Sequence, residues 1–263
     1  MSSYRSELGP WLRRPVARPE AGLRLVCFPH AGGGAAAFRP WQRLLPEGVE
    51  PLTVQYPGRE DRFADRPVGA MPLLVAEVVA AVEPLLDRPY ALFGHSMGSA
   101  VAFEVAVELR RRGHRPPVRL LAAGRPSPHH ARAGDVHRGD DDALAAELVR
   151  QGGTPREVLA DPDLRAAVLR YVREDYRLIE TYRPSSAEPL SCPVSVLRGA
   201  DDPECGERAA LTWSSTTRGE LKVTVFAGGH FFLVPQRARV AETIGRDLGA
   251  HAGRPVRAWP STP

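Results

Sequence analysis

The segment at residues 94–98 reads Gly-His-Ser-Met-Gly and carries the residue types that nucleophilic catalysis needs. A short apolar run at residues 90–93 stops abruptly at this segment, and apolar positions at helical spacing follow it at residues 99–112. The pattern predicts a strand, a sharp turn and a helix, with the serine at the turn. Because flanking glycines permit so tight a turn, the motif is typical of a nucleophile elbow, which exposes the serine Oγ. We expect Ser96 to be a nucleophile.

A carboxylate and a histidine that could activate this serine follow two later apolar runs. Asp201 and Asp202 come after the run at residues 193–198, and His230 comes after the run at residues 221–226. The chain order of nucleophile, acid and histidine is that of the α/β-hydrolase triad. In that triad the histidine takes the serine proton, and the carboxylate holds the imidazole in its productive tautomer. The sequence therefore predicts a Ser-His-Asp triad.

Two other residues compete for roles in this triad. We choose Asp202 over Asp201, because Asp202 lies three residues after Gly199 and directly before Pro203, in a rigid turn. Asp201 would more naturally cap a segment or face water. Cys205 is an alternative nucleophile, but no elbow motif presents it. The acid is therefore assigned to Asp202, and the serine stays the nucleophile.

A catalytic serine also needs hydrogen-bond donors for the oxyanion that forms on the substrate. The Met97 N–H lies at the start of the predicted helix, where backbone amides are unpaired and the helix dipole is positive. The second donor of such a site comes from the loop after an earlier strand. The glycine-rich residues 29–34 directly follow the apolar run at residues 23–28. We assign this donor to the Ala31 N–H.

Strand-like and helical segments alternate along most of the chain. The apolar runs that predict strands are residues 23–28, 51–56, 90–93, 118–124, 193–198 and 221–226. The helical patterns between and after them are at residues 72–86, 99–112, 206–216 and 235–248. Nearly continuous apolar strands that alternate with helices indicate a parallel sheet covered on both faces. The sequence predicts an α/β class protein with the α/β-hydrolase fold, a mostly parallel central sheet flanked by helices, in a single domain over residues 1–263.

Three parts of the chain depart from this alternation. Between about residues 125 and 189 the pattern is helical only, and Asp161-Pro162 resembles an N-cap and first-turn pair that opens a long helix. One face of that helix is mostly apolar, which packing onto the main body would explain. We prefer an inserted helical lid over Ser96 that shapes an acyl pocket. Residues 1–20 and 251–263 lack periodicity, and we expect both ends to be flexible.

Composition excludes several classes of protein. No apolar run approaches the roughly 20 residues that a membrane span needs, and no signal peptide follows Met1, so we expect a cytoplasmic protein that does not bind membranes. The three cysteines form no metal-ligand pattern or disulfide framework. The net charge of +4 is modest and gives no reason to expect nucleic acid binding. The basic run at residues 110–115 fits a helix end, with a docking patch for an acidic partner as the alternative.

The chain resembles the type II thioesterases, the stand-alone editing enzymes of polyketide and nonribosomal peptide assembly lines. The resemblance runs from about residue 22 to 248. It rests on five segments, which are Pro-His-Ala-Gly-Gly at 29–33, Gln-Tyr-Pro-Gly-Arg at 55–59, Gly-His-Ser-Met-Gly at 94–98, Asp-Pro at 202–203 and Gly-His-Phe-Phe at 229–232. It implies that Ser96 is the nucleophile, His230 the base and Asp202 its orienting acid, with Ala31 and Met97 as oxyanion donors.

The resemblance also implies an activity and a partner. The expected reaction is hydrolysis of acyl thioesters on the phosphopantetheine arm of acyl or peptidyl carrier proteins, which removes stalled or mis-primed chains. No metal and no bound cofactor is expected, because the substrate itself brings the phosphopantetheine. Carrier domains are the expected transient partners, and a monomer is the starting expectation. The alternatives are another serine esterase, a thioesterase that releases a finished product, and a non-catalytic carrier-binding protein with the same fold.

Overall fold

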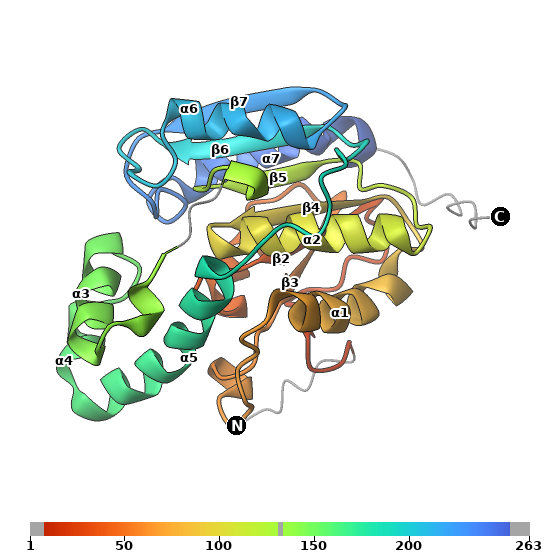
Figure 1. Cartoon of the computed structure of the whole chain (residues 1–263). Helices are drawn as coiled ribbons and strands as arrows, with labels where there is room; N and C mark the ends of the chain where they lie inside the picture. The colour runs from red at the N-terminus through yellow and green to blue at the C-terminus, as the bar shows by residue number, and fades with distance from the viewer. Residues whose placement is uncertain (1–7, 131–133, 253–263) are drawn as a thin grey trace.

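A seven-stranded sheet forms the centre of the molecule (Figure 1). The computed structural model describes residues 8–130 and 134–252. Its strands are β1 (Leu12–Arg13), β2 (Leu23–Phe28), β3 (Val49–Val54), β4 (Tyr90–His95), β5 (Leu120–Ala123), β6 (Val194–Gly199) and β7 (Leu221–Phe226). They lie in the order β1-β3-β2-β4-β5-β6-β7, and all neighbouring pairs are parallel except β1 with β3. This is the α/β-hydrolase fold predicted from the sequence.

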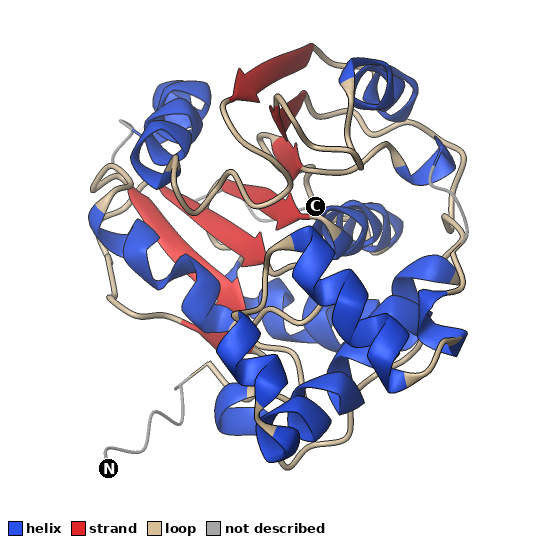
Figure 2. Ribbon diagram, turned by 90° about the vertical axis from the view of Figure 1, so that its left-hand side faces the viewer, coloured by secondary structure: helices blue, strands red, loops and turns tan. Residues whose placement is uncertain are grey.

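Helices lie on both sides of the sheet, as Figure 2 shows in a view turned by 90° from that of Figure 1. The α-helices are α1 (Met71–Val82), α2 (Met97–Arg111), α3 (Asp141–Gln151), α4 (Arg156–Ala160), α5 (Pro162–Glu180), α6 (Glu207–Leu211) and α7 (Arg237–Ala252). The 3-10 segments are η1 (Ala35–Arg43), η2 (Glu60–Arg62), η3 (Glu83–Leu85), η4 (Pro128–His130), η5 (Val136–Arg138) and η6 (Thr212–Thr216). None of the helices within the described residues is long and apolar enough to span a membrane.

The sheet separates two apolar cores because successive side chains of a strand point to opposite faces. In β2, Val26 and Phe28 join the core that holds α1 and α2, whereas Leu25 and Cys27 join the core that holds η1 and α7. Both sets are almost fully buried. The central strands are therefore apolar on both faces, which explains their nearly continuous hydrophobic runs.

The N-terminal region differs from the expectation of a flexible arm over residues 1–20. Residues 1–7 lie outside the described residues, but within residues 8–20 the chain forms β1, which pairs antiparallel with β3. Leu12 is completely buried, and the Gln55 N–H donates to the Trp11 carbonyl at 2.8 Å. This segment is an edge strand of the sheet, so the prediction was wrong for it. A strand of two residues lacks the alternation that would reveal it in a sequence.

Helices α3, α4 and α5 are inserted between β5 and β6, within the region where the sequence predicts a lid. Asp161 caps α5 as expected, since its side chain accepts hydrogen bonds from the Asp163 and Leu164 N–H groups at 3.0 and 2.9 Å. Helices α3 and α5 share a small apolar core of their own, formed by Leu144, Leu148, Leu169 and Val172, and Leu159 of α4 packs against it. The lid is therefore a packed unit. Figure 1 shows it at one end of the sheet, in green and teal.

The helix after the elbow ends in the basic run at residues 110–115. Gly113 follows α2 with a φ of +80°, which is the left-handed conformation common after helix ends. Arg111 and Arg112 both form ion pairs with Glu108, at 2.7 and 2.8 Å. These charges therefore support the helix end. At the C-terminus, α7 runs to Ala252, and residues 253–263 of the tail that we expected to be flexible lie outside the described residues.

Candidate active site

Ser96 lies at a strained turn between β4 and α2. Its φ and ψ are 53° and −117°, a conformation that few non-glycine residues adopt. The Ser96 N–H donates to the Ala123 carbonyl at 2.8 Å, which ties the turn to β5. A Cβ atom on Gly94 would lie 2.2 Å from the Gly98 carbonyl oxygen, and one on Gly98 would lie 2.0 Å from that of Phe28. Both glycines are therefore required by close backbone contact, as the nucleophile-elbow motif predicts.

His230 and Asp202 meet beside this turn. The His230 Nδ1 lies 3.1 Å from each Asp202 carboxylate oxygen, and the Asp202 side chain has no exposed area. Asp202 Oδ1 also accepts the Glu204 N–H at 2.9 Å, which fixes the carboxylate. The Asp201 side chain is exposed instead. The contact at Nδ1 leaves His230 Nε2 for a reaction partner, and His230 lines the same cavity as Ser96.

Gly124, the residue after β5, lies against this pair. Its φ is +68°, and a Cβ atom there would lie 3.3 Å from His230 Cε1 and 3.4 Å from Asp202 Oδ2. A side chain at this position would therefore press on the imidazole and the carboxylate. Sequence reasoning placed Gly124 at the end of a strand but gave it no role.

Two residues with unpaired backbone N–H groups lie at the cavity near Ser96. Ala31 and Met97 both line it, and neither N–H has a hydrogen-bond partner among the described residues. Ala31 lies in a tight turn in which the Gly33 N–H donates to the His30 carbonyl at 2.9 Å. Met97 is the first residue of α2, where helix amides are unpaired. Both groups are therefore available as oxyanion donors.

Sequence reasoning missed a buried ion pair behind this turn. Asp175 of α5 accepts the Gly32 N–H at 2.8 Å and binds the Arg59 guanidinium at 2.6 and 2.9 Å. Both side chains are almost fully buried. The signals in the sequence were indirect, since Arg59 ended the Gln-Tyr-Pro-Gly-Arg segment and Asp175 was the one charge on an otherwise apolar helix face.

Two further histidines lie close to His230. The ring centroids of His30 and His95 are 5.2 Å apart, those of His95 and His230 are 5.1 Å apart, and Phe231 packs edge-on against all three rings. The His95 Nε2 donates to the His230 carbonyl at 2.9 Å, which fixes the backbone of the loop that carries His230. Burial and the neighbouring His230 lower the pKa of His30 from 6.5 to about 3 and that of His95 well below its usual value. Both are therefore neutral near pH 7.

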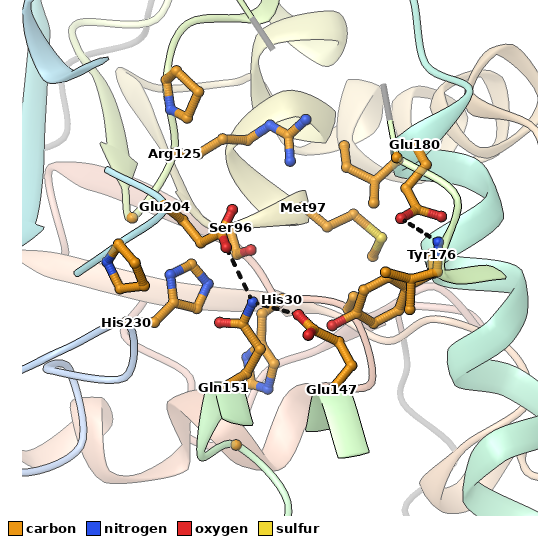
Figure 3. A pocket seen from close by; sticks show the side chains of 18 of the residues that line it. His30, Ser96, Met97, Arg125, Glu147, Gln151, Tyr176, Glu180, Glu204 and His230 are labelled. Atoms are coloured by element: carbon orange, nitrogen blue, oxygen red, sulfur yellow. Dashed lines mark hydrogen bonds between the residues drawn. The ribbon is translucent and has the colours of Figure 1, made fainter. Parts of the chain in front are cut away.

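The cavity has a volume of about 800 Å³ and lies between the loops that carry Ser96 and His230 and the helices of the lid. Figure 3 shows Ser96 in it, with His230 on one side and Met97 on the other. The Gln151 side chain donates to Glu147 at 2.8 Å and to Glu204 at 3.4 Å, as the dashed lines mark. Apolar atoms come from residues that include Met97, Leu148, Ile179 and Phe231. The cavity can hold a small acyl group with polar residues at its wall.

The remaining candidates have no place in this arrangement. Cys205 is completely buried, and burial raises the pKa of its thiol to about 12, so the thiolate needed for attack does not form near neutral pH. Within the described ranges, no group of three or more His, Cys, Asp or Glu residues could hold a metal ion.

Comparison with known proteins adds independent findings. The model of the thioesterase domain family matches residues 23–248. The chain is 40% identical over 251 residues to a probable cadicidin biosynthesis thioesterase of Streptomyces griseus, covering 95% of this chain and 68% of the relative. It is 39% identical to thioesterase PikA5 of Streptomyces venezuelae, covering 94% of this chain and 88% of the relative.

Solved structures give the same result. The thioesterase RedJ from the prodiginine pathway of Streptomyces coelicolor superimposes with a TM-score of 0.83 at 37% identity, covering 88% of each chain. The type II thioesterase BorB from the borrelidin cluster superimposes with a TM-score of 0.84 at 38% identity, covering 92% of this chain and 98% of BorB.

Proposed function

The chain belongs to the thioesterase domain family and is a type II thioesterase of polyketide or nonribosomal peptide biosynthesis, and on this premise we propose its chemistry. It hydrolyses acyl thioesters on the phosphopantetheine arm of acyl or peptidyl carrier proteins. Its role is to remove stalled or mis-primed chains. The carrier contact is transient, the enzyme acts as a monomer, and it needs neither metal nor bound cofactor.

The proposed reaction has two halves that share one intermediate. Ser96 Oγ attacks the thioester carbonyl while His230 Nε2 takes the serine proton, and Asp202 stabilises the imidazolium that forms. The Ala31 and Met97 N–H groups bind the oxyanion. The C–S bond then breaks, His230 returns its proton to the pantetheine sulfur, and the acyl group remains on Ser96. Water activated by His230 attacks this ester, which releases the free acid and restores Ser96.

One observation carries this proposal. The strained Ser96, His230 and the residues with unpaired amides, Ala31 and Met97, line one cavity, and Asp202 contacts His230, although these residues come from four separate loops. A non-catalytic carrier-binding protein has no need for a strained serine or unpaired amides. The arrangement therefore favours acyl transfer to water over simple binding.

The test is release of free acid from short acyl groups loaded on a holo carrier protein. Wild type is compared with Ser96→Ala, and the same acyl groups are offered as simple oxygen esters. We expect rapid hydrolysis of the carrier thioester that Ser96→Ala abolishes without loss of folding. Cleavage of the oxygen ester alone would make the chain an esterase. Release of only one particular full-length product would make it a product-releasing thioesterase.

A further inference from the structure

The Ala31 amide is held by a turn whose direction is set by its neighbours. The peptide between His30 and Ala31 is planar and trans, so its carbonyl and the Ala31 N–H point in opposite directions. The hydrogen bond from the Gly33 N–H to the His30 carbonyl therefore also sets the direction of the Ala31 N–H. Gly32 has a φ of +82°, as the third residue of a type II turn requires.

The Arg59–Asp175 pair forms hydrogen bonds with this turn from outside the cavity. Asp175 Oδ2 accepts the Gly32 N–H at 2.8 Å, and Arg59 Nη1 approaches the Gly33 carbonyl at 3.3 Å. The pair thus binds one donor and one acceptor of consecutive residues. Neither side chain lines the cavity that holds Ser96, so neither touches the reacting atoms.

The lid helix α5 packs on the same turn. Asp175, Tyr171 and Val172 all belong to α5, and a Cβ atom on Gly32 would lie 3.1 Å from Val172 Cγ2. The Arg59 guanidinium lies over the Tyr171 ring at 4.7 Å, which orients it toward Asp175. The position of α5 therefore decides whether the Gly32 N–H keeps its hydrogen bond to Asp175.

A buried ion pair is a weak source of stability, because removing two charges from water offsets most of their attraction. The buried charges of this pair are better explained by a role in positioning the turn. A carboxylate accepts short hydrogen bonds from a backbone N–H and a guanidinium at the same time. We infer that Arg59 and Asp175 are positioning residues for the oxyanion hole. They hold the turn so that the Ala31 N–H faces the Ser96 site. Because Asp175 belongs to α5, the geometry of the oxyanion hole then depends on the position of this lid helix. This inference rests on the proposed function.

The main test is Asp175→Asn, which keeps the side-chain size and removes the charge. Loss of a complete oxyanion donor costs about 10²–10³ in kcat, so a loosened donor should cost about 10- to 100-fold, with KM for a short acyl-pantetheine changed less than about twofold. Glu174→Gln is the matched control, because Glu174 is the preceding residue of α5 and forms a partly exposed pair with Arg177. It should keep kcat within about twofold.

A second readout separates positioning from folding. Affinity for an alkylboronic acid, whose boron takes the place of the thioester carbonyl carbon and forms a tetrahedral adduct with Ser96 Oγ, should fall in Asp175→Asn by the same factor as kcat/KM. Arg59→Lys keeps a charge near Asp175 and should retain more activity than Arg59→Met. All assays run well below each variant's unfolding temperature. If Asp175→Asn does not fold, Asp175→Glu, which keeps the charge on a longer side chain, takes its place with the same expected loss of kcat.

The outcomes separate this inference from the proposed function. The rate at which a fluorophosphonate labels Ser96 needs no carrier substrate, yet it depends on the same oxyanion hole. Slower labelling of folded Asp175→Asn than of Glu174→Gln would support the inference. Equal labelling, or unchanged kcat and boronate affinity, would overturn it. A wild type that labels at Ser96 but hydrolyses no carrier thioester would overturn only the proposed function.

Discussion

A methyl group at Gly124, which lines the cavity beside Ser96, should disturb the contact between His230 and Asp202. In Gly124→Ala the new Cβ atom would lie 3.3 Å from His230 Cε1, 3.3 Å from His95 Nε2 and 3.4 Å from Asp202 Oδ2. The two 3.3 Å distances are tighter than nine in ten Cβ contacts in proteins, so the surrounding groups must move by a few tenths of an ångström. The imidazole and the carboxylate are the groups that catalysis can least allow to move.

The backbone and the contacts contribute separately to the expected effect. A residue with a Cβ atom in the left-handed region costs about 1–2 kcal/mol, which lowers the unfolding temperature by roughly 2–8 °C in a chain of this size. A displacement of 1 Å can cost about 100-fold in rate, so a few tenths should lower kcat about 3- to 10-fold.

Gly113→Ala is the matched control, because Gly113 has a φ of +80° but open space around its Cβ position. It should lose about the same 1–2 kcal/mol of stability and keep its full kcat. Thermal unfolding and hydrolysis of one acyl-pantetheine would be measured for both variants. The reasoning is refuted if the two variants have equal kcat, since crowding of His230 would then have no consequence.

Three other substitutions or conditions test separate parts of the site. Asp202→Asn should lower kcat by roughly 10³–10⁴-fold because the imidazole loses its orienting charge, whereas Asp201→Asn should change kcat little; similar values for both would contradict the assignment of the acid. Cys205→Ala should keep kcat within about twofold, and a thiol reagent should leave native Cys205 unmodified at pH 8, since burial raises its pKa to about 12. His30 and His95 have lowered pKa values in the folded protein, so the unfolded chain binds more protons below pH 6.5. As the pH is lowered from 6.5 to 5, the unfolding free energy should therefore fall by up to about 1.4 kcal/mol per pH unit for each histidine. Urea unfolding at pH 7.5, 6 and 5 measures this fall, and equal stability at all three would disprove it.

The features that the sequence predicted correctly depend on short segments. The elbow motif determines its own strand, turn and helix, because only glycine fits where Gly94 and Gly98 meet neighbouring backbone. The apolar runs of the central strands report burial on both faces, so the sheet could be predicted strand by strand. The structure also places Asp202 against His230, in the rigid turn before Pro203, and leaves Asp201 exposed.

The features that sequence reasoning missed depend on contacts between distant residues. Arg59 and Asp175 are 116 residues apart, and neither has a local pattern that reveals the other. Asp175 lies among apolar residues on one face of α5, and the helical periodicity of that face does not indicate a partner for its charge. Strand β1 exists because β3 offers an unpaired edge, which the arginine- and proline-rich sequence around Leu12 does not indicate.

The lid consists of two parts that could be exchanged separately. Helices α3 and α4 pack on α5 through their own small core, whereas α5 also binds the turn that carries Ala31. A graft of residues 136–160 from another thioesterase could therefore change which acyl group fits while leaving the rate of the chemical step intact. A graft that includes α5 would also have to replace the partners of Asp175, which are Arg59 and the turn within residues 30–34.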